Sequence, residues 1–140
     1  MKSGWLCCVL LGCGLSPAAL TSPALDHGEF VRFVEPVLER RCGNPTCHGE
    51  ARRPLRIFAP ERFRADPTRL HEPGPLTDDE LRANERAAAT FAAEIMRAED
   101  SLLLTKALAR VPHLGDRVFA DESDGGYQAL LSWLRSGGLP

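Results

Sequence analysis

Two cysteines and a histidine form the most specific chemical motif of this sequence. The stretch reads Cys42-Gly43-Asn44-Pro45-Thr46-Cys47-His48. Two thiols this close can hold one haem by two thioether bonds, and the adjacent histidine is then the proximal iron ligand. The commoner attachment spacing is C-x-x-C-H, whereas four residues separate the thiols here. Gly43 and Pro45 suit the turn that this longer loop requires. The motif predicts one covalently bound haem c, with His48 on the iron.

A second axial ligand is expected on the far side of the haem. Besides His48, the chain contains three histidines, at positions 27, 71 and 113. We favour His113, because it lies in a short Pro- and Gly-containing loop that can face the ring. Met96 is the alternative, since Met/His ligation is common in cytochromes c and raises the reduction potential. His71 is a third candidate, and an open sixth position would favour gas binding or peroxidase-type chemistry.

An arginine-rich segment follows the motif. Residues 40–69 contain eight arginines, and prolines divide the segment into short pieces. The planar guanidinium group suits carboxylates, so these arginines are candidates to pair with the haem propionates. The first candidates for this pairing are Arg52, Arg53 and Arg56, because they closely follow His48. The alternative interpretation is a solvated, irregular loop.

Other chemistry is also open to the two thiols. In an oxidising compartment, Cys42 and Cys47 could form a disulfide, and the protein would then be an exported helical lipoprotein used for binding or assembly. A zinc site made of these thiols, His48 and His113 is a further alternative. No catalytic triad, phosphate-binding glycine loop or paired-carboxylate site can be identified, so we do not expect an enzyme.

The first residues are typical of an export signal. Lys2 supplies a positive charge, a short apolar run follows, and Leu10-Leu11-Gly12-Cys13 is similar to a bacterial lipobox. The run is too short to span a bilayer as a helix. We therefore expect a signal peptide at 1–12 and a lipid on Cys13. Cleavage near Ala18 or Ala19 is the alternative, and it would give a soluble periplasmic protein.

Composition sets the remaining limits. The chain has 140 residues, 44% of them hydrophobic and 26% charged, which is ordinary for one globular domain. We expect a flexible tether at 13–25 and a single domain at 26–140. The formal net charge of −2 argues against nucleic-acid binding.

Helix signals recur along the domain, and no strand-rich region is evident. Capping boxes at Asp26–Glu29 and Thr77–Glu80 predict two helix starts, and Ser101 can cap a third, shorter helix. A last helix is expected from about Gly126 to Gly137. Apolar residues recur on one face of the first helix, at Phe30, Val34, Val37 and Leu38, and mark the buried stripe of the second, at Leu81, Ala88, Phe91, Ala92 and Ile95. The third helix carries Leu102, Leu103, Leu104, Ala107 and Leu108. The inner face of the last helix is expected to hold Tyr127, Leu130, Leu131 and Leu134, with Trp133 beside it. Pro36 predicts a kink or an early end of the first helix. The fold is predicted to be mostly α.

Several of these segments together resemble a known family. The segments are Phe30-x-x-Phe33-Val34-x-Pro36-Val37-Leu38, Cys47-His48-Gly49, Ser101-Leu102-Leu103 and Tyr127-x-x-Leu130-Leu131-x-Trp133-Leu134-x-x-Gly137. They are similar to small exported bacterial c-type cytochrome modules of the planctomycete and myxobacterial type.

This resemblance implies a cytochrome c-like helical fold around one haem. The first and last helices would cross beside the haem, with Phe30, Phe33, Leu130 and Trp133 at the crossing. It also implies electron transfer with a redox partner protein in the cell envelope.

Overall fold

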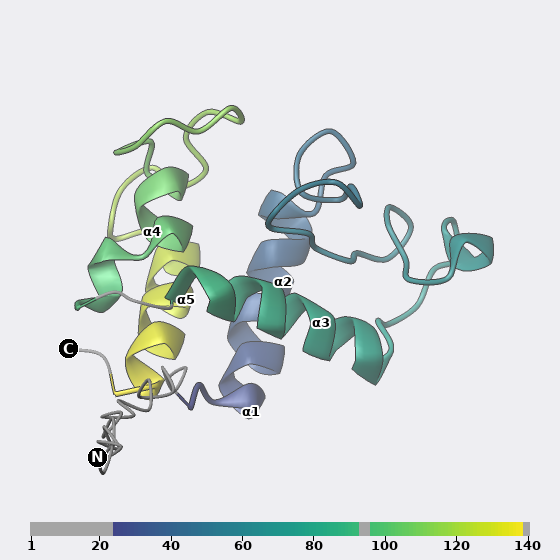
Figure 1. The fold of residues 1–140 in the computed structure, drawn as a ribbon, viewed down its shortest axis with the longest axis horizontal. Coiled ribbons are helices and arrows are strands. Elements are labelled where there is room, and N and C mark those ends of the chain that lie inside the picture. Colours follow the sequence, from purple (N-terminus) through teal and green to yellow (C-terminus); the bar gives the residue numbers. More distant parts are fainter. Residues whose placement is uncertain (1–23, 93–95, 139–140) are drawn as a thin grey trace, which may run out of the picture.

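The computed structural model describes residues 24–92 and 96–138, and this part of the chain is mostly helical (Figure 1). Within these residues there is no strand, only an isolated bridge between Ala59 and Phe63. The prediction of a mostly α fold is confirmed. No helix in the same ranges is long and apolar enough to cross a membrane. The predicted signal peptide, the lipidated Cys13, most of the tether and Ile95 lie outside the described residues.

The chain first forms one continuous helical segment, residues 27–42, which we call the first helical segment. It comprises α1 (His27–Glu29), the π turn η1 (Phe30–Val34), α2 (Glu35–Val37) and the π turn η2 (Leu38–Cys42). Asp26 caps its start, because the Asp26 carboxylate accepts a hydrogen bond from the Glu29 N–H at 2.6 Å. Half of the expected capping box therefore forms. Glu29 instead accepts a hydrogen bond from Ser132 on the last helix, at 2.5 Å.

The expectation of an early end at Pro36 is wrong, since the helical segment continues to Cys42. A proline ring clashes with the carbonyl four residues before it in a regular α-helix. Here a wider π turn precedes the proline, and the Glu35 N–H bonds to the carbonyl of Phe30, five residues back. Helices accommodate such local irregularities by π turns of this kind. As a result, the segment delivers Cys42 at its end.

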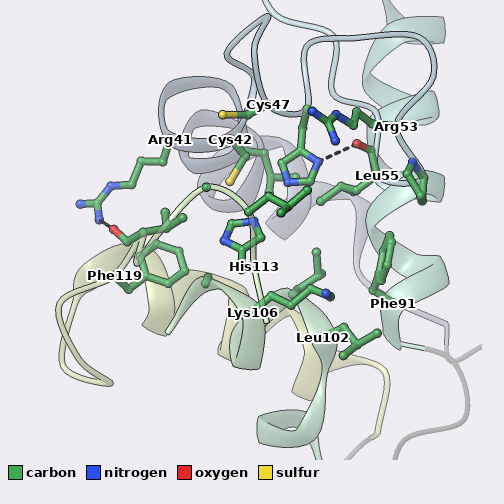
Figure 2. A pocket seen from close by; sticks show the side chains of 18 of the residues that line it. Arg41, Cys42, Cys47, Arg53, Leu55, Phe91, Leu102, Lys106, His113 and Phe119 are labelled. Atoms are coloured by element: carbon green, nitrogen blue, oxygen red, sulfur yellow. Dashed lines mark hydrogen bonds between the residues drawn. The ribbon is translucent and has the colours of Figure 1, made fainter. Parts of the chain in front are cut away.

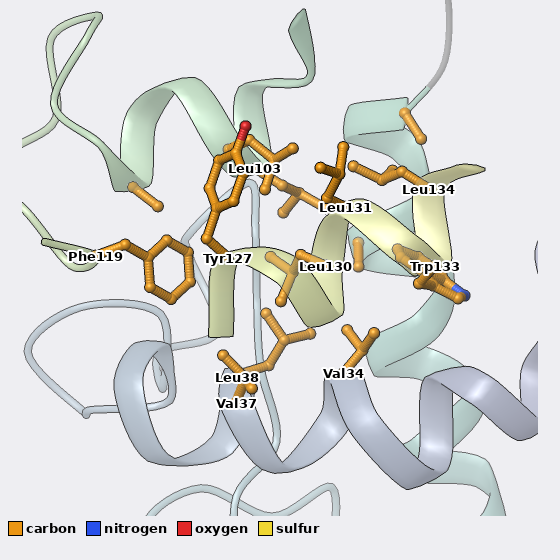
Figure 3. Close-up of a cluster of buried hydrophobic side chains, with 14 of the residues drawn as sticks. Val34, Val37, Leu38, Leu103, Phe119, Tyr127, Leu130, Leu131, Trp133 and Leu134 are labelled. Carbon is orange, nitrogen blue, oxygen red and sulfur yellow. The ribbon is translucent and has the colours of Figure 1, made fainter. Parts of the chain in front are cut away.

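The last helix, α5 (Gly125–Ser136), crosses this first segment, as predicted (Figure 3). Asp124 caps α5 by accepting a hydrogen bond from the Gly126 N–H at 2.8 Å. The rings of Phe30 and Trp133 lie 5.2 Å apart at 54°, and both side chains are fully buried. The placement of Phe33 at the crossing is wrong, because its side chain is 52% exposed.

The helix α3 (Asp78–Ala89) begins with the predicted capping box of Thr77 and Glu80, and the 3-10 turn η4 (Thr90–Ala92) extends it. Its inner face differs from the prediction. Ala88 and Ala92 are buried as predicted, but Leu81 is only partly buried, and Glu80 and Asn84 are buried instead. The two polar side chains can be buried because each has partners: Glu80 pairs with Arg64 at 2.9 Å, and Asn84 bonds to backbone groups described below.

A short helix completes the core. After the 3-10 turn η5 (Ala98–Asp100), α4 (Leu102–Ala107) begins at Ser101, whose hydroxyl accepts a hydrogen bond from the Leu103 N–H at 3.2 Å. The predicted cap is therefore confirmed. The long connection before α3 contains a single 3-10 turn, η3 (Pro67–Arg69). Residues 43–59 and 108–118 lie at the same end of the helices (Figure 1). The cysteine motif and the His113 loop consequently meet.

Candidate cofactor site

The turn between the two cysteines is held by Asn44. Its backbone carbonyl accepts from the N–H groups of Cys47, at 2.8 Å, and Gly49, at 2.9 Å. Its side-chain oxygen accepts from both the N–H and the hydroxyl of Thr46, each at 2.9 Å. Asparagine commonly bonds the backbone two residues on in this way. A four-residue spacing between thiols is thus accommodated in one compact turn.

His48 is fixed on one side by residues that follow it. The Nδ1–H of its ring donates to the carbonyl of Leu55 at 2.8 Å, and the Ile57 N–H donates to the His48 carbonyl at 2.8 Å. A carbonyl oxygen only accepts, so Nδ1 must carry the proton of the neutral ring. The lone pair of Nε2 is then free to bind a metal.

The electrostatic surroundings of His48 favour the neutral imidazole that a metal requires. Its pKa lies below the ordinary value, mainly because burial disfavours the charged ring, and the nearby Arg53 and Lys106 act in the same direction. The hydrogen bond to Leu55 opposes this shift without reversing it.

His113 faces His48 from the opposite loop. The two imidazole rings have centroids 6.0 Å apart and planes 12° from parallel. Nδ1 of His113 donates to the carbonyl of Asp116 at 2.9 Å, so its Nε2 is also unprotonated in the neutral ring. Two imidazoles that bind one metal ion through a nitrogen each, at about 2.0 to 2.1 Å per bond, have centroids roughly 6 Å apart. The observed centroid distance matches this spacing, and the two rings lie stacked.

The two imidazoles border a cavity of about 350 Å³ (Figure 2). This volume falls in the range of roughly 300 to 1,000 Å³ that is typical of small-molecule and cofactor sites. Its walls are mainly apolar and come from the first helical segment, the loops, α4 and α5. The apolar lining residues are Leu38, Pro54, Leu55, Phe91, Leu102, Leu103, Ala107, Pro112, Leu114, Val118, Phe119 and Leu130.

Both thiols line the same cavity and both are free. Their sulfur atoms lie on the side of the cavity away from Phe91 (Figure 2). Burial raises the pKa of Cys42 to about 12, and the neighbouring Cys47 adds to the effect. Cys42 is therefore a protonated thiol at neutral pH and a weak nucleophile.

The alternative zinc site is not formed. Among residues 24–92 and 96–138, no three His, Cys, Asp or Glu side chains come close enough together to hold a metal ion. Tetrahedral zinc needs three or four such ligands from the protein.

Of the three predicted arginines, only Arg53 lines the cavity. Its guanidinium donates to the Thr46 carbonyl at 3.4 Å. Arg52 is 90% exposed in its side chain and pairs with Glu50 at 2.6 Å. Arg56 is also exposed, with its guanidinium 5.1 Å from the centre of the Phe58 ring. The structure therefore does not bring Arg52 and Arg56 to the cavity, and Arg53 pairs with Glu50 as well, at 3.6 Å.

The alternative sixth ligands lie elsewhere. Met96 is 83% exposed and does not line the cavity. His71 is exposed in the connection before α3, and it does not line the cavity either. His27 bonds to Glu85 through Nδ1 at 2.6 Å, at the far end of the first helical segment. His113 is thus the candidate that the structure brings to His48.

Sequence reasoning missed several residues of this site, among them Arg41, which also lines the cavity. Phe119 and Phe91 form part of its walls, and Lys106 lies at its edge with its ammonium donating to the Pro112 carbonyl at 2.9 Å (Figure 2). Phe91 had been assigned to the core. Lys106 lies four residues after Leu102 on α4, so the two side chains share one face of that helix. This spacing is the signal that could have placed Leu102 and Lys106 on the cavity side.

Comparison of the chain with protein-family models, curated proteins and solved structures found no match.

Proposed function

We propose that this protein is a c-type cytochrome with one covalently bound haem that transfers electrons. The observation that carries the proposal is the pair of opposed imidazoles, His48 and His113, across an apolar cavity that both thiols also line. Each ring has its Nδ1–H bonded to a backbone carbonyl, which is the outer contact that metal-binding histidines usually make.

In this proposal each residue has a distinct task. His48 and His113 would bind the iron, and Cys42 and Cys47 would hold the porphyrin through thioether bonds, formed when each S–H group adds across a vinyl double bond. The bound haem supplies one-electron chemistry between ferric and ferrous iron. The apolar walls would exclude water, and two histidine ligands would favour a lower potential than Met/His ligation gives.

Arg41, Arg53 and Lys106 all line the cavity and supply positive charge from different sides of it (Figure 2). A guanidinium or an ammonium there would complement the propionate carboxylates of a bound haem. Arg52 and Arg56 have no part in this arrangement.

The test is to express the full chain with a bacterial haem-attachment system and to measure haem after denaturation. We expect haem absorbance to stay with the polypeptide. Expression without that system should give colourless protein, since the high pKa of the Cys42 thiol disfavours unassisted attachment. Colourless protein with a Cys42–Cys47 disulfide under attachment conditions would refute the proposal and favour a helical binding or assembly module.

Single variants assign the axial ligands. His113→Ala should change the near-infrared and low-temperature electron paramagnetic resonance signals of the ferric protein from those of bis-histidine ligation. Met96→Ala and His71→Ala are matched controls, because both side chains lie outside the cavity, and they should leave these signals unchanged. An unchanged spectrum in His113→Ala would exclude that residue as ligand.

We also propose that the protein works in the cell envelope, anchored by a lipid on Cys13 and serving a redox partner protein. This rests on the lipobox-like Leu10-Leu11-Gly12-Cys13 and on the fact that haem is attached to such motifs outside the cytoplasm. Metabolic labelling with a fatty acid should mark the wild-type protein but not Cys13→Ala. Labelling of both, or of neither, would contradict a lipid at this residue.

A further inference from the structure

Asn84 lies on the inner face of α3 and is fully buried. Its side-chain oxygen accepts from the N–H of Phe58 at 2.8 Å, and its amide nitrogen donates to the carbonyl of the same residue at 2.9 Å. The amide nitrogen also donates to Glu35 Oε1 at 2.9 Å. One side chain therefore satisfies both backbone groups of a single loop residue and connects them to the first helical segment.

Phe58 belongs to a short segment, residues 55–58, that is bonded on its other side to His48. Leu55 accepts from the His48 ring, and Ile57 donates to the His48 carbonyl, both at 2.8 Å. No regular helix or strand holds these four residues. Apart from the burial of Leu55, Ile57 and Phe58, these residues are held by hydrogen bonds to His48 on one side and to Asn84 on the other.

We propose that Asn84 is a positioning residue for His48. By holding residues 55–58, Asn84 keeps the Leu55 carbonyl where it accepts the Nδ1–H of His48 and so maintains the tautomer with a free Nε2. The consequence for iron ligation rests on the proposed function. The hydrogen bonds that link Asn84 to residues 55–58 and His48 do not depend on that proposed function.

The chemistry of the side chain explains why an amide is needed. An amide offers one acceptor and two donor protons, and here it uses all of them, on Phe58 and Glu35. An aspartate at this position could still accept from Phe58 but could not donate. An alanine would leave both backbone groups of Phe58 buried without a partner.

Glu80 provides a matched control on the same helix. It is also buried, four residues before Asn84, but its partners are Arg64, Ala65 and Thr77, and none lies in residues 55–58. A general loss of stability should therefore follow from changes at either position. A change in the His48 ring should follow only from changes at Asn84.

The experiment uses the haem-free full chain labelled with nitrogen-15 in histidine, at a pH where the rings are neutral. Long-range proton–nitrogen correlation spectra distinguish the two tautomers, and His48→Gln assigns the signals. We expect a single Nδ1–H tautomer of His48 in the wild type and in Glu80→Gln. In Asn84→Ala, a measurable population of the Nε2–H tautomer should appear.

A second variant guards against loss of folding in Asn84→Ala. The double variant Glu35→Gln/Asn84→Asp avoids two adjacent buried carboxylates and removes only the donor to Phe58, so it should also show mixed tautomers. A mixed tautomer in the wild type, or a single Nδ1–H tautomer in both Asn84 variants, would overturn the inference. If the tautomer responds as expected but no haem attaches under attachment conditions, the positioning role stands and the proposed function fails.

Discussion

Glu35 is a buried carboxyl group whose ionisation should govern stability near neutral pH. It is 4% exposed, and within the described residues Oε1 accepts from Asn84 whereas Oε2 has no hydrogen-bond partner. Burial raises the pKa of Glu35 from 4.5 to about 7; the bond from Asn84 opposes this shift, and nearby Glu39 adds to it. The folded state thus holds a proton that the unfolded chain releases at lower pH.

The sign of the effect follows from proton linkage. Between pH 4.5 and about 7, the folded state binds more protons at Glu35 than the unfolded state does, so this group makes stability fall as pH rises. At about 1.36 kcal/mol per pKa unit, the interval corresponds to roughly 3 kcal/mol. This is a large part of the 5 to 15 kcal/mol by which domains are typically stable.

Replacing Glu35 with glutamine should remove this contribution, because a glutamine oxygen can still accept from Asn84 and carries no charge at any pH. Urea unfolding of wild type and Glu35→Gln at several pH values gives the difference in unfolding free energy. The variant should gain roughly 3 kcal/mol relative to wild type from pH 4.5 to pH 8. Glu39→Gln, on the same helical segment but less buried, is the control and should show a much smaller change. Parallel stability curves for wild type and Glu35→Gln would refute the reasoning.

Three further changes test the fold around the site. Gly49→Ala should prevent the turn between the thiols from forming, because an added Cβ would lie 2.6 Å from a backbone carbonyl oxygen of that turn. Gly125→Ala is the control, since a Cβ at that position would meet open space, and this variant should unfold like wild type in thermal melts. Arg64→Met should lower the unfolding free energy by about 3 to 5 kcal/mol in denaturant titrations, since it leaves Glu80 buried and unpaired. Burial would raise the pKa of Glu80, but hydrogen bonds from Arg64 and from backbone groups lower it to about 2. The stability that the ionised Glu80 contributes to the wild type should therefore be lost as pH falls from 4.5 towards 2. A wild type whose stability shows no such loss would contradict the pairing. Asp124→Ala should cost about 1 to 2 kcal/mol by removing the cap of α5, and an unchanged urea midpoint would show that the cap contributes nothing.

The helix starts could be predicted because the groups that fix them are close in sequence. Thr77 and Glu80 bond to each other's backbone across one turn, and Ser101 caps a helix two residues on. Such local contacts are readable from residue type and spacing. The apolar face of α5 was predicted for the same reason, since its period repeats within one element.

The inner face of α3 could not be predicted because its partners are distant in sequence. Asn84 bonds to Phe58, 26 residues away, and to Glu35, 49 residues away. Without these partners, burying an amide is unfavourable, and an amide in a helix is expected to face solvent. The choice among Arg52, Arg53 and Arg56 failed for a similar reason, because only the fold of the loop decides which guanidinium meets the cavity.

The first and last helices are joined by side-chain bonds as well as by packing. The Asp26 N–H donates to the Ser136 hydroxyl at 3.0 Å, and Ser132 donates to Glu29. Residues 26 and 136 are therefore neighbours, while the turn at 73–75 is exposed and far from His48 and His113 in the fold (Figure 1). A circularly permuted chain, opened in this turn and closed by a short glycine–serine linker between the old ends, should keep the same arrangement. The domain can thus be inserted as a loop into a host protein, with its cavity held in a chosen orientation.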